Sequence, residues 1–353
     1  MTDRLAVVLF NLGGPDGPEA LRPFLFNLFN DKAIIGAPQP IRWLLARFIS
    51  TRRAPVAQQI YAELGGGSPL LANTETQAEA LAAMLVDRNI AEEVRCFIAM
   101  RYWHPLTEET VTAVRDWAPD RVVMLPLYPQ YSTTTTGSSV GRWTRCAESA
   151  RLMAPTAGIC CYPVLDGFIE AVAGGVREAL GEISSGLRPR VLFTAHGLPE
   201  KIIAAGDPYQ GQVERTAAAV AARVGGDGYD WTVCYQSRVG PLQWIGPATD
   251  DVIREAGVDG RPVVVVPIAF VSEHSETLVE LDIEYRALAR EAGVPQYVRV
   301  ATVGTSPAFI AGLADLVAAN AAAPSTGAAA LCSAEGGRVC PADRSGCGFA
   351  APG

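Results

Sequence analysis

The fold is decided by residues 262–285, which read PVVVVPIAFVSEHSETLVELDIEY. The apolar, β-branched run 262–270 predicts a strand that is buried on both faces, as strands of parallel sheets are. The polarity then inverts, and we expect a helix with Ser272 as its N-cap. The core-facing stripe of that helix recurs at helical spacing and consists of Leu278, Leu281, Tyr285 and Leu288.

The opposite face of this helix carries Glu276, Glu280 and Glu284, each four residues from the next. No basic residue follows Glu276 or Glu280 four places on, and like charges at that spacing cost about 0.2–0.5 kcal/mol per pair. His274 lies at the strand-to-helix switch, where open α/β sheets bind ligands, and it converges with Glu276 only if the helical turn is loosened. A solvated helix surface is one interpretation of this acidic row. We favour the other, a site for a divalent cation or for proton relay.

Length and composition limit the classes of protein to which this chain can belong. Its 353 residues suffice for two domains, and 49% of them are hydrophobic, so we expect a globular protein. The formal net charge of −8 argues against nucleic-acid binding. No apolar run approaches the ~20 residues that span a bilayer. The N-terminus shows neither signal-peptide nor transit-peptide features, so the sequence predicts a cytoplasmic protein.

The second half of the chain repeats the order of motifs in the first half. Residues 191–199 (VLFTAHGLP) resemble residues 8–15 (VLFNLGGP), each a buried strand that ends in a glycine-containing turn. The predicted strands 96–101 and 232–238 both close on an arginine. The sequence therefore predicts an α/β protein of two similar Rossmann-like domains, with doubly wound parallel sheets around a cleft that the strand C-termini line.

Three segments are expected along the chain. An N-terminal domain, 1–165, contains an inserted apolar lip at about 16–70. A C-terminal domain, 166–302, carries the metal or proton site. The tail, 303–353, consists of a helix, an Ala-rich linker and a cysteine-containing end.

The inserted lip contains two strongly apolar segments, 24–29 and 41–49, which carry aromatic residues and a few arginines. Both are expected to be helical. Two interpretations are equally supported, a pair of core helices and an apolar lip around a ligand or at a membrane surface.

The chain contains three histidines. His196 follows a strand in the same predicted domain as His274, and we expect both to reach one crevice. His196 would then act as a base or a metal ligand facing the acidic row. His104, which precedes Pro105, is interpreted as a structural or rim residue.

Eight cysteines are present, and three of them, Cys332, Cys340 and Cys347, lie in the tail. Disulfides are not expected in a cytoplasmic protein, so a metal or iron–sulfur site is the favoured interpretation. Three thiolates do not complete a set of four ligands, so the fourth must come from elsewhere.

Seven motifs occur together and in order, and through them the chain resembles the ferrochelatase family, whose members insert ferrous iron into a porphyrin in the last step of haem synthesis. They are LFNLGGPD from Leu9, LGGGSPL from Leu64, RYWHPLTEE from Arg101, LYPQYS from Leu127, AHGLP from Ala195, CYQSRVGPLQWIGP from Cys234, and PIAFVSEHSETLVELDIEY from Pro267. The resemblance extends from about Leu5 to Leu316. It implies two Rossmann-like domains with the porphyrin in the cleft.

The resemblance implies roles for individual residues. His196 is similar to the histidine credited with pyrrole deprotonation or iron binding, Glu276 to its carboxylate partner, and His274 to the second histidine of the site. Glu280 and Glu284 resemble the acidic row that carries metal in or protons out. The positions that line the porphyrin pocket or hold its propionates match Leu12, Tyr61, Ser68, Arg101, Tyr102, Gln236 and Trp244.

The substrates that the resemblance implies are ferrous iron and protoporphyrin IX. Leu12 is closer to the Met of members that use protoporphyrin than to the Tyr of members that use coproporphyrin. A coproporphyrin or cobalt chelatase of the same fold is an alternative, as is a tetrapyrrole carrier without activity. The presence of both His196 and Glu276 argues against the carrier, which needs no proton acceptor.

The tail cysteines resemble those that hold a [2Fe–2S] cluster in some members. The ligand outside the tail follows the QYS motif in those members, where this chain has Thr133. The fourth ligand is therefore expected to be Cys160 or Cys161. Cys146 is a less favoured candidate. The apolar lip resembles the segment that meets the membrane in membrane-associated members. A bacterial enzyme, monomeric or homodimeric and peripheral on the inner face of the membrane, is the implied setting.

Overall fold

The computed structural model describes residues 3–322, apart from 239 and 241, and residues 330–349. The chain divides into two compact units. The first comprises residues 1–161, 313–339 and 348–353, and the second comprises residues 162–312 and 340–347. Each unit contains one parallel sheet with helices on both faces, which confirms the predicted doubly wound α/β architecture.

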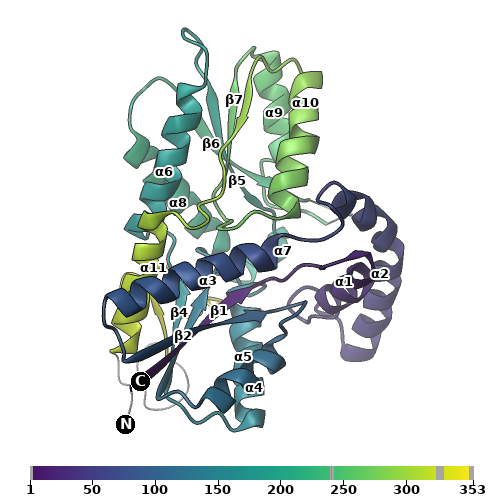
Figure 1. Ribbon diagram of the computed structural model, residues 1–353. Coiled ribbons are helices and arrows are strands. Elements are labelled where there is room, and N and C mark those ends of the chain that lie inside the picture. Colours follow the sequence, from purple (N-terminus) through teal and green to yellow (C-terminus); the bar gives the residue numbers. More distant parts are fainter. Residues whose placement is uncertain (1–2, 239, 241, 323–329, 350–353) are drawn as a thin grey trace. The chain divides into compact units, whose positions relative to one another are not determined.

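The sheet of the first unit has the strand order β2-β1-β3-β4-β9, and all its strand pairs are parallel. Its strands are β1 Arg4–Asn11, β2 Glu93–Met100, β3 Arg121–Pro126, β4 Thr156–Cys161 and β9 Ala330–Ser333. Helix α3 (Leu70–Asp87) covers one face, and α4 (Thr107–Trp117) and α5 (Thr136–Ala150) cover the other (Figure 1). β1 is buried because it lies between β2 and β3.

The sheet of the second unit has the order β6-β5-β7-β8 and is also parallel. Its strands are β5 Arg190–His196, β6 Asp230–Gln236, β7 Val263–Pro267 and β8 Tyr297–Arg299. Helices α6 (Asp166–Gly181) and α8 (Tyr209–Val224) lie on one face, and α9 (Thr249–Val258) and α10 (Tyr285–Glu291) lie on the other (Figure 1). The first four strands of each unit follow the same spatial order, which confirms the repeat predicted from the sequence.

The helix that follows β7 begins differently from the prediction. Ser272 is not its N-cap, because residues 276–284 form a π-helix, η2 (Glu276–Glu284), whose N-cap is Ser275. In a π-helix each N–H bonds to the carbonyl five residues back, as the N–H of Tyr285 does to Glu280, so the turn is wider than an α-turn. A loosened turn, which we expected the convergence of His274 with Glu276 to need, is therefore present from Glu276 onward.

The wider turn also changes which side chains reach the core. Leu281 is buried, and Tyr285 and Leu288 pack against the same cluster, as predicted. Leu278 is only half-buried, whereas Thr277 and Val279 on either side of it are buried. The predicted stripe is thus right at its C-terminal end and wrong at its start, where the i→i+5 pattern rotates the helix.

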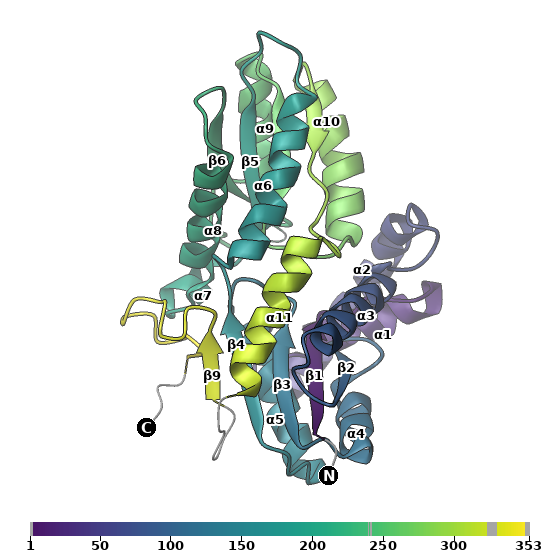
Figure 2. The same ribbon diagram turned by 60° about the vertical axis from the view of Figure 1, so that its left-hand side comes forward.

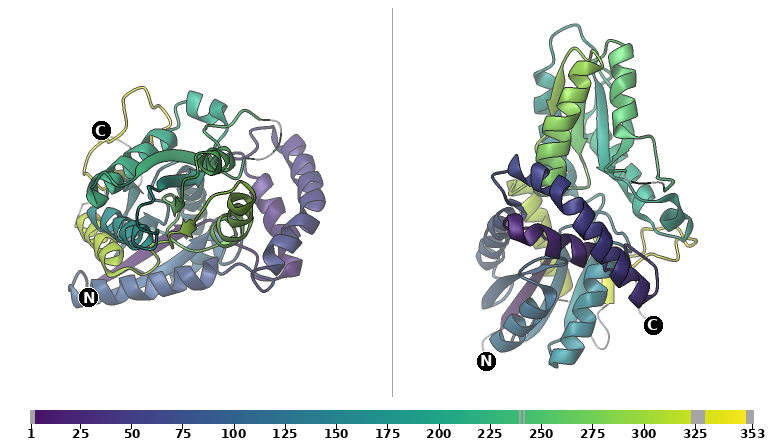
Figure 3. Two further views of the ribbon diagram at one scale, coloured as in Figure 1. Left: turned by 90° about the horizontal axis from the view of Figure 1, so that it is seen from above. Right: turned by 90° about the vertical axis from the view of Figure 1, so that its right-hand side faces the viewer.

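The predicted lip consists of η1 (Pro18–Ala20), α1 (Leu21–Phe29) and α2 (Gln39–Ala62), and α1 and α2 pack against each other (Figure 3). The small residues Ala46 and Ser50 of α2 are buried, while Leu44 and Phe48 are 61% and 63% exposed. A helix that turns small residues inward and large apolar residues outward is not a core helix, so the interpretation of α2 as a core helix is wrong. No helix in the described part of the chain has the length and apolarity needed to cross a membrane.

The C-terminal tail adds a strand that the sequence does not predict. After α11 (Pro307–Ala321), the Ala/Pro/Ser/Gly run 323–329 lies outside the described residues, as does the side chain of Cys332. β9 then pairs in parallel with β4 at the edge of the first sheet (Figure 2). A strand of four residues next to a low-complexity run carries too little periodicity to be recognised from sequence.

Candidate active site

His196 and Glu276 meet in the second unit. β5 ends at His196 and η2 begins at Glu276, so both lie at the C-terminal edge of the sheet, where parallel sheets bind ligands. The Nδ1 nitrogen of His196 is 2.9 Å from Oε2 of Glu276. Because the carboxylate accepts the hydrogen bond from Nδ1–H, the Nε2 nitrogen of the neutral ring keeps its lone pair. The side chain of His196 is 39% exposed, so the ring remains accessible to a substrate.

Each member of this pair stabilises the charged form of the other. Burial raises the pKa of Glu276, but the His196 ring and its hydrogen bond overcome this effect and bring the pKa to about 2. Burial lowers the pKa of His196, yet the Glu276 carboxylate and its hydrogen bond raise it above its usual value. The result is a histidine with increased basicity whose protonated form has a carboxylate partner.

Glu280 follows Glu276 along η2 and accepts hydrogen bonds at both of its oxygens. Oε2 accepts from Nε2 of Gln236 at 3.1 Å and from the hydroxyl of Ser237 at 2.5 Å. Oε1 accepts from the N–H of Ser237 at 2.8 Å and from the hydroxyl of Tyr285 at 3.1 Å. Burial and the Glu276 charge raise the pKa of Glu280 despite these hydrogen bonds. Glu280 therefore takes up a proton more readily than Glu276 does.

Ser237 is a site residue that sequence reasoning missed. Its φ is +59°, a conformation that non-glycine residues rarely adopt and that functional sites tend to retain. This conformation places both its N–H and its hydroxyl against the Glu280 carboxylate. The sequence signal that points to Ser237 is its position directly after the end of β6, next to Gln236.

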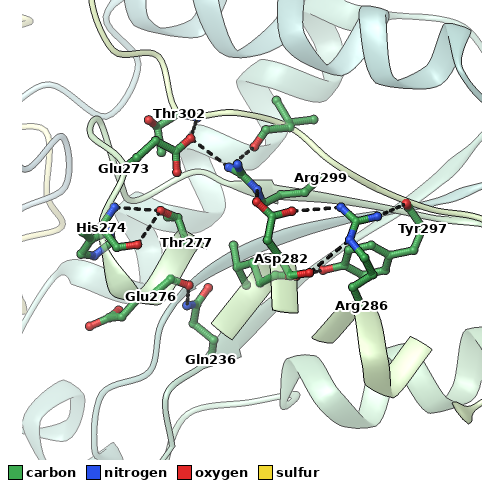
Figure 4. A network of polar contacts seen from close by, with 12 residues as sticks. Gln236, Glu273, His274, Glu276, Thr277, Asp282, Arg286, Tyr297, Arg299 and Thr302 are labelled. Carbon is green, nitrogen blue, oxygen red and sulfur yellow. Dashed lines mark hydrogen bonds and ion pairs between the residues drawn. The ribbon is translucent and has the colours of Figure 1, made fainter. Parts of the chain in front are cut away.

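His274 lies near the pair as a buried imidazole. Its ring centroid is 4.7 Å from that of Phe270, and its buried Nδ1 has no hydrogen-bond partner among the described residues. Burial lowers the pKa of His274, so the ring is neutral at pH 7. Its backbone N–H donates to the Thr277 hydroxyl at 3.0 Å, and that hydroxyl donates to its carbonyl at 3.1 Å (Figure 4). His274 thereby fixes the start of η2.

Glu284 and Trp244 occupy different positions relative to this cluster. Glu284, at the end of η2, is exposed, so the three acids do not form one buried array. Trp244 forms a β-bridge with Pro199. Its ring lies against Gly197, where an added Cβ would be 3.4 Å from the ring and 3.0 Å from the Gln236 carbonyl. Trp244 therefore packs beside the strand end that carries His196.

In the first unit, Arg101 and Tyr102 bind an aspartate that the sequence did not reveal. The Oδ2 of Asp31 accepts hydrogen bonds from Arg101 Nη2 at 2.7 Å, the Tyr102 hydroxyl at 2.8 Å and the Ser138 hydroxyl at 2.5 Å. Burial raises the pKa of Asp31, but the Arg101 charge and the hydrogen bonds from its neighbours hold it below its usual value. Because Asp31 lies between α1 and α2, this network ties the lip to the C-terminal end of β2.

The other predicted porphyrin contacts of the first unit lie around the turn after β1. The carbonyl of Leu12 accepts a hydrogen bond from the N–H of Tyr102 at 3.0 Å. Ser68 packs so closely on Gly14 that a Cβ there would collide with it. Tyr61 is buried near the end of α2.

The cysteines fall into separate groups. Cys160 and Cys161 are buried at the end of β4, and their sulfurs are 3.5 Å apart. Cys340 is buried, and its sulfur accepts a hydrogen bond from Nε2 of Gln212 at 3.1 Å. Three further cysteines are partly exposed, Cys96, Cys146 and Cys347. Among the residues that the structure describes, no group of three or more His, Cys, Asp or Glu side chains is arranged to hold a metal ion.

The chain is similar in sequence to proteins described as ferrochelatases. A family model with the description Ferrochelatase matches residues 4–321. The ferrochelatase of Caulobacter vibrioides (strain NA1000 / CB15N) is 60% identical over 317 residues, which cover 90% of this chain and 90% of that protein. The ferrochelatase of Phenylobacterium zucineum (strain HLK1) is 54% identical over 344 residues, which cover 98% of this chain and 97% of that protein.

The fold is similar to that of solved chelatase structures. SirB from Bacillus subtilis with Fe³⁺ aligns with a TM-score of 0.52 at 13% identity and covers 91% of this chain and 96% of its own. The sirohydrochlorin chelatase SirB of Bacillus subtilis subspecies spizizenii, in complex with cobalt, aligns with a TM-score of 0.50 at 13% identity, covering 90% of this chain and 95% of its own. At this identity the likeness concerns the fold alone, and it confirms the predicted chelatase-like architecture.

Proposed function

The chain belongs to the ferrochelatase family and is a lyase of haem biosynthesis, and we propose that its His196–Glu276 pair carries the insertion of ferrous iron into protoporphyrin IX. The observation that carries this proposal is the 2.9 Å contact between Nδ1 of His196 and the Glu276 carboxylate. Two pyrrole N–H protons must leave the porphyrin before a divalent ion can bind. A neutral imidazole whose other nitrogen is held by a carboxylate is suited to accept one of them.

The acids of η2 complete the proton balance. For each iron ion inserted, two protons leave the porphyrin. Nε2 of His196 accepts one proton, and Glu276 stabilises the imidazolium that forms. Glu280 accepts the second proton because its pKa is raised, and the exposed Glu284 at the end of η2 passes protons to solvent.

Iron approaches as a substrate and needs ligands that release it. Before Nε2 of His196 accepts a proton, it can bind ferrous iron together with a carboxylate oxygen of Glu276, because imidazole nitrogen and carboxylate oxygen are donors that ferrous iron accepts. His274 adds a neutral imidazole close to them. A small set of protein ligands holds the ion loosely enough to pass it to the porphyrin nitrogens.

The porphyrin is held by the residues that the family resemblance assigns. Arg101 and Tyr102 would bind a propionate, which is a carboxylate like that of Asp31, to which both donate hydrogen bonds in the structure. The remaining contacts are assigned to Leu12, Tyr61, Ser68, Gln236 and Trp244.

An anaerobic assay tests the proposed reaction. Purified protein is mixed with ferrous iron and either protoporphyrin IX or coproporphyrin, and the Soret and visible bands are followed. We expect conversion of protoporphyrin to haem at the higher rate. Faster conversion of coproporphyrin would overturn the substrate assignment, and tight porphyrin binding without any conversion would identify a carrier.

The apolar lip supports peripheral contact with a membrane, on the cytoplasmic face. Leu44 and Phe48 of α2 are exposed, and Arg47 lies over the ring of Trp43 on the same helix, a combination typical of interfacial helices. Burying one large apolar side chain contributes about 1.5–3 kcal/mol. Phe48→Ser should therefore weaken binding to vesicles of phosphatidylcholine and phosphatidylglycerol about tenfold. Val258→Ser, which changes an exposed apolar residue of the second unit, is the control and should bind as the wild type does.

We also propose a [2Fe–2S] cluster held by Cys332, Cys340 and Cys347 with Cys160 or Cys161. The amide that donates to the Cys340 sulfur fits a thiolate ligand, since hydrogen bonds to sulfur tune such clusters. A bound cluster would supply one-electron redox chemistry. Cys340→Ser should remove the visible absorbance and the acid-labile sulfide of the protein, while Cys96→Ser should leave both unchanged. The absence of acid-labile sulfide from the wild-type protein would contradict this proposal.

A further inference from the structure

Arg299 is a buried cation next to the site that neither the motifs nor the proposed reaction uses. It is the last residue of β8, where it pairs in register with Val265 of β7. Its side chain is only 10% exposed. A buried guanidinium must be satisfied by charged or polar partners, so its contacts define what it does.

The guanidinium of Arg299 joins the carboxylates at the two ends of one short segment of the chain (Figure 4). Its Nε donates to Oδ2 of Asp282 at 2.6 Å, and its Nη1 donates to Oε1 of Glu273 at 2.9 Å. The N–H of Thr302 donates to the same Glu273 oxygen at 2.9 Å. A planar fork that reaches both acids at once fixes their separation as well as their charge.

These two acids bracket the stretch that carries the reactive side chains. Glu273 directly precedes His274, and Asp282 lies two residues after Glu280. The segment between them begins with the turn held by Thr277 and continues as the π-helix. Arg299 therefore clamps the segment from both ends.

The far end of η2 receives further support from the same side. The guanidinium of Arg286 donates to Oδ1 of Asp282 at 2.9 Å and to the carbonyl of Tyr297 at 3.1 Å (Figure 4). The hydroxyl of Tyr297 donates to the carbonyl of Leu281 at 2.6 Å. These contacts hold the end of the π-helix to β8, but none of them reaches Glu273.

A π-helix needs such support because its geometry is uncommon and is found mostly as single turns at functional sites. The wide turn is what places Glu276 beside His196 and Glu280 beside Ser237. Removal of Arg299 would leave two half-buried carboxylates without their shared cation and would release both ends of the segment.

We infer that Arg299 is a positioning residue, which sets the geometry of Glu276 and Glu280 by clamping Glu273 and Asp282. The side chain of Arg299 contacts Glu273 and Asp282, and through them it acts on η2. The inference rests on the proposed function, because it assigns Arg299 to the same site. It extends that function to a residue outside every motif that carried the family resemblance.

The test compares Arg299→Lys with Arg286→Lys. Lysine keeps the charge in both variants, but its single ammonium cannot reach both carboxylates in fixed geometry as the guanidinium does. Misplacement of reactive groups by about 1 Å can cost about 10²-fold in rate. We expect Arg299→Lys to lower kcat at least tenfold while the KM for porphyrin changes less than about twofold. Arg286→Lys, the control on the exposed side of the same network, should keep kcat within about twofold of wild type.

Amide hydrogen exchange provides a readout that needs no turnover. In Arg299→Lys the amides of residues 274–284 should exchange faster than in the wild type and in Arg286→Lys. A kcat within twofold of wild type, or unchanged exchange in this segment, would overturn the inference. A wild type that fails to form haem would count against the proposed function alone, because the exchange comparison stands without it.

A second pair of variants serves if Arg299→Lys does not fold. Glu273→Gln and Asp282→Asn each keep the shape of a carboxylate and weaken one end of the clamp. Each should lower kcat several-fold with faster exchange at its own end of the segment. If both keep wild-type kcat, Arg299 does not position the site.

Discussion

The two units share a strand order, yet the C-terminal edges of their sheets carry different chemistry. In the first unit, Asp31 is held in a closed set of hydrogen bonds by Arg101, Tyr102 and Ser138. In the second, Glu276 accepts a hydrogen bond from the titratable ring of His196, and its charge acts on the neighbouring carboxylate of Glu280. We propose that the first edge binds substrate and the second exchanges protons, so that function follows the side chains at the strand ends and not the fold.

The pKa values of the carboxylates express this difference. Asp31 and Glu276 have lowered pKa values because each faces a basic partner, whereas the pKa of Glu280 is raised by burial and by its charged neighbour. Two acids whose environments push their pKa values apart are the usual sign of acid–base chemistry. The first unit contributes no such pair around Asp31.

The largest predicted effect comes from matched amide substitutions in the two units. Glu276→Gln removes the carboxylate that orients His196 and should lower kcat by about 10²–10⁴-fold, the usual contribution of acid–base catalysis. Asp31→Asn makes the same chemical change in the first unit and should keep kcat within a few-fold while it raises the KM for porphyrin. Steady-state kinetics with both substrates distinguish these outcomes. An equal loss of kcat in both variants would show that the units do not differ as described.

Asp31→Asn should instead be detected in stability. Asp31 is buried and charged, and a charged hydrogen bond contributes about 1.5–3 kcal/mol. The free energy of unfolding should fall by about 2 kcal/mol, measured by urea denaturation. A variant as stable as the wild type would show that this network does not hold the lip.

The next largest effect is a shift in pH dependence. His196 acts in its neutral form, and its pKa is raised above 6.5, so kcat should rise with pH through an apparent pKa above that value. In Glu276→Gln the effect of burial remains without the carboxylate, and the apparent pKa of the residual activity should move below 6.5. An unchanged pH–rate profile in this variant would show that His196 takes no part in the rate-limiting proton transfer.

The pair also stabilises the fold in a defined pH window. The contribution of His196 is complete below pH 6.5 and is lost as pH rises through its raised pKa. That of Glu276 is complete above pH 4.5 and is lost as pH falls towards 2. The pair therefore stabilises the protein fully between these values.

The smallest predicted effect lies within the acidic row. Glu280→Gln removes a buried proton acceptor and should lower kcat about tenfold. Glu284→Gln changes an exposed carboxylate and should alter kcat less than about twofold. An equal loss of activity in both variants would show that Glu280 and Glu284 contribute equally to proton transfer, despite the greater exposure of Glu284.

Periodicity in the sequence predicted most of the fold. The apolar runs of β1, β5 and β7 and their repeated order were sufficient to predict two similar parallel sheets. β9 was not predicted, because four residues after a low-complexity run are too few to show a hydrophobic periodicity. The N-cap at Ser272 was wrong because a π-turn starts three residues later than the α-helix expected there.

The candidate site was predicted only where residues lie within motifs. His196 and Glu276 are brought together as expected. Asp31 and Arg299 lie outside the motifs, and Ser237 was missed although it lies within the motif from Cys234, because the importance of all three depends on contacts between segments far apart in the sequence. A lone Asp, Ser or Arg has no pattern that separates it from a surface residue.

The most direct test of the account combines insertion and binding in His196→Ala. Porphyrin affinity is measured by fluorescence quenching, and insertion by anaerobic conversion of protoporphyrin IX with ferrous iron. We expect a porphyrin affinity within about twofold of wild type and a loss of insertion of at least about 10²-fold. Retained insertion in this variant would contradict the assignment of the base to the second unit.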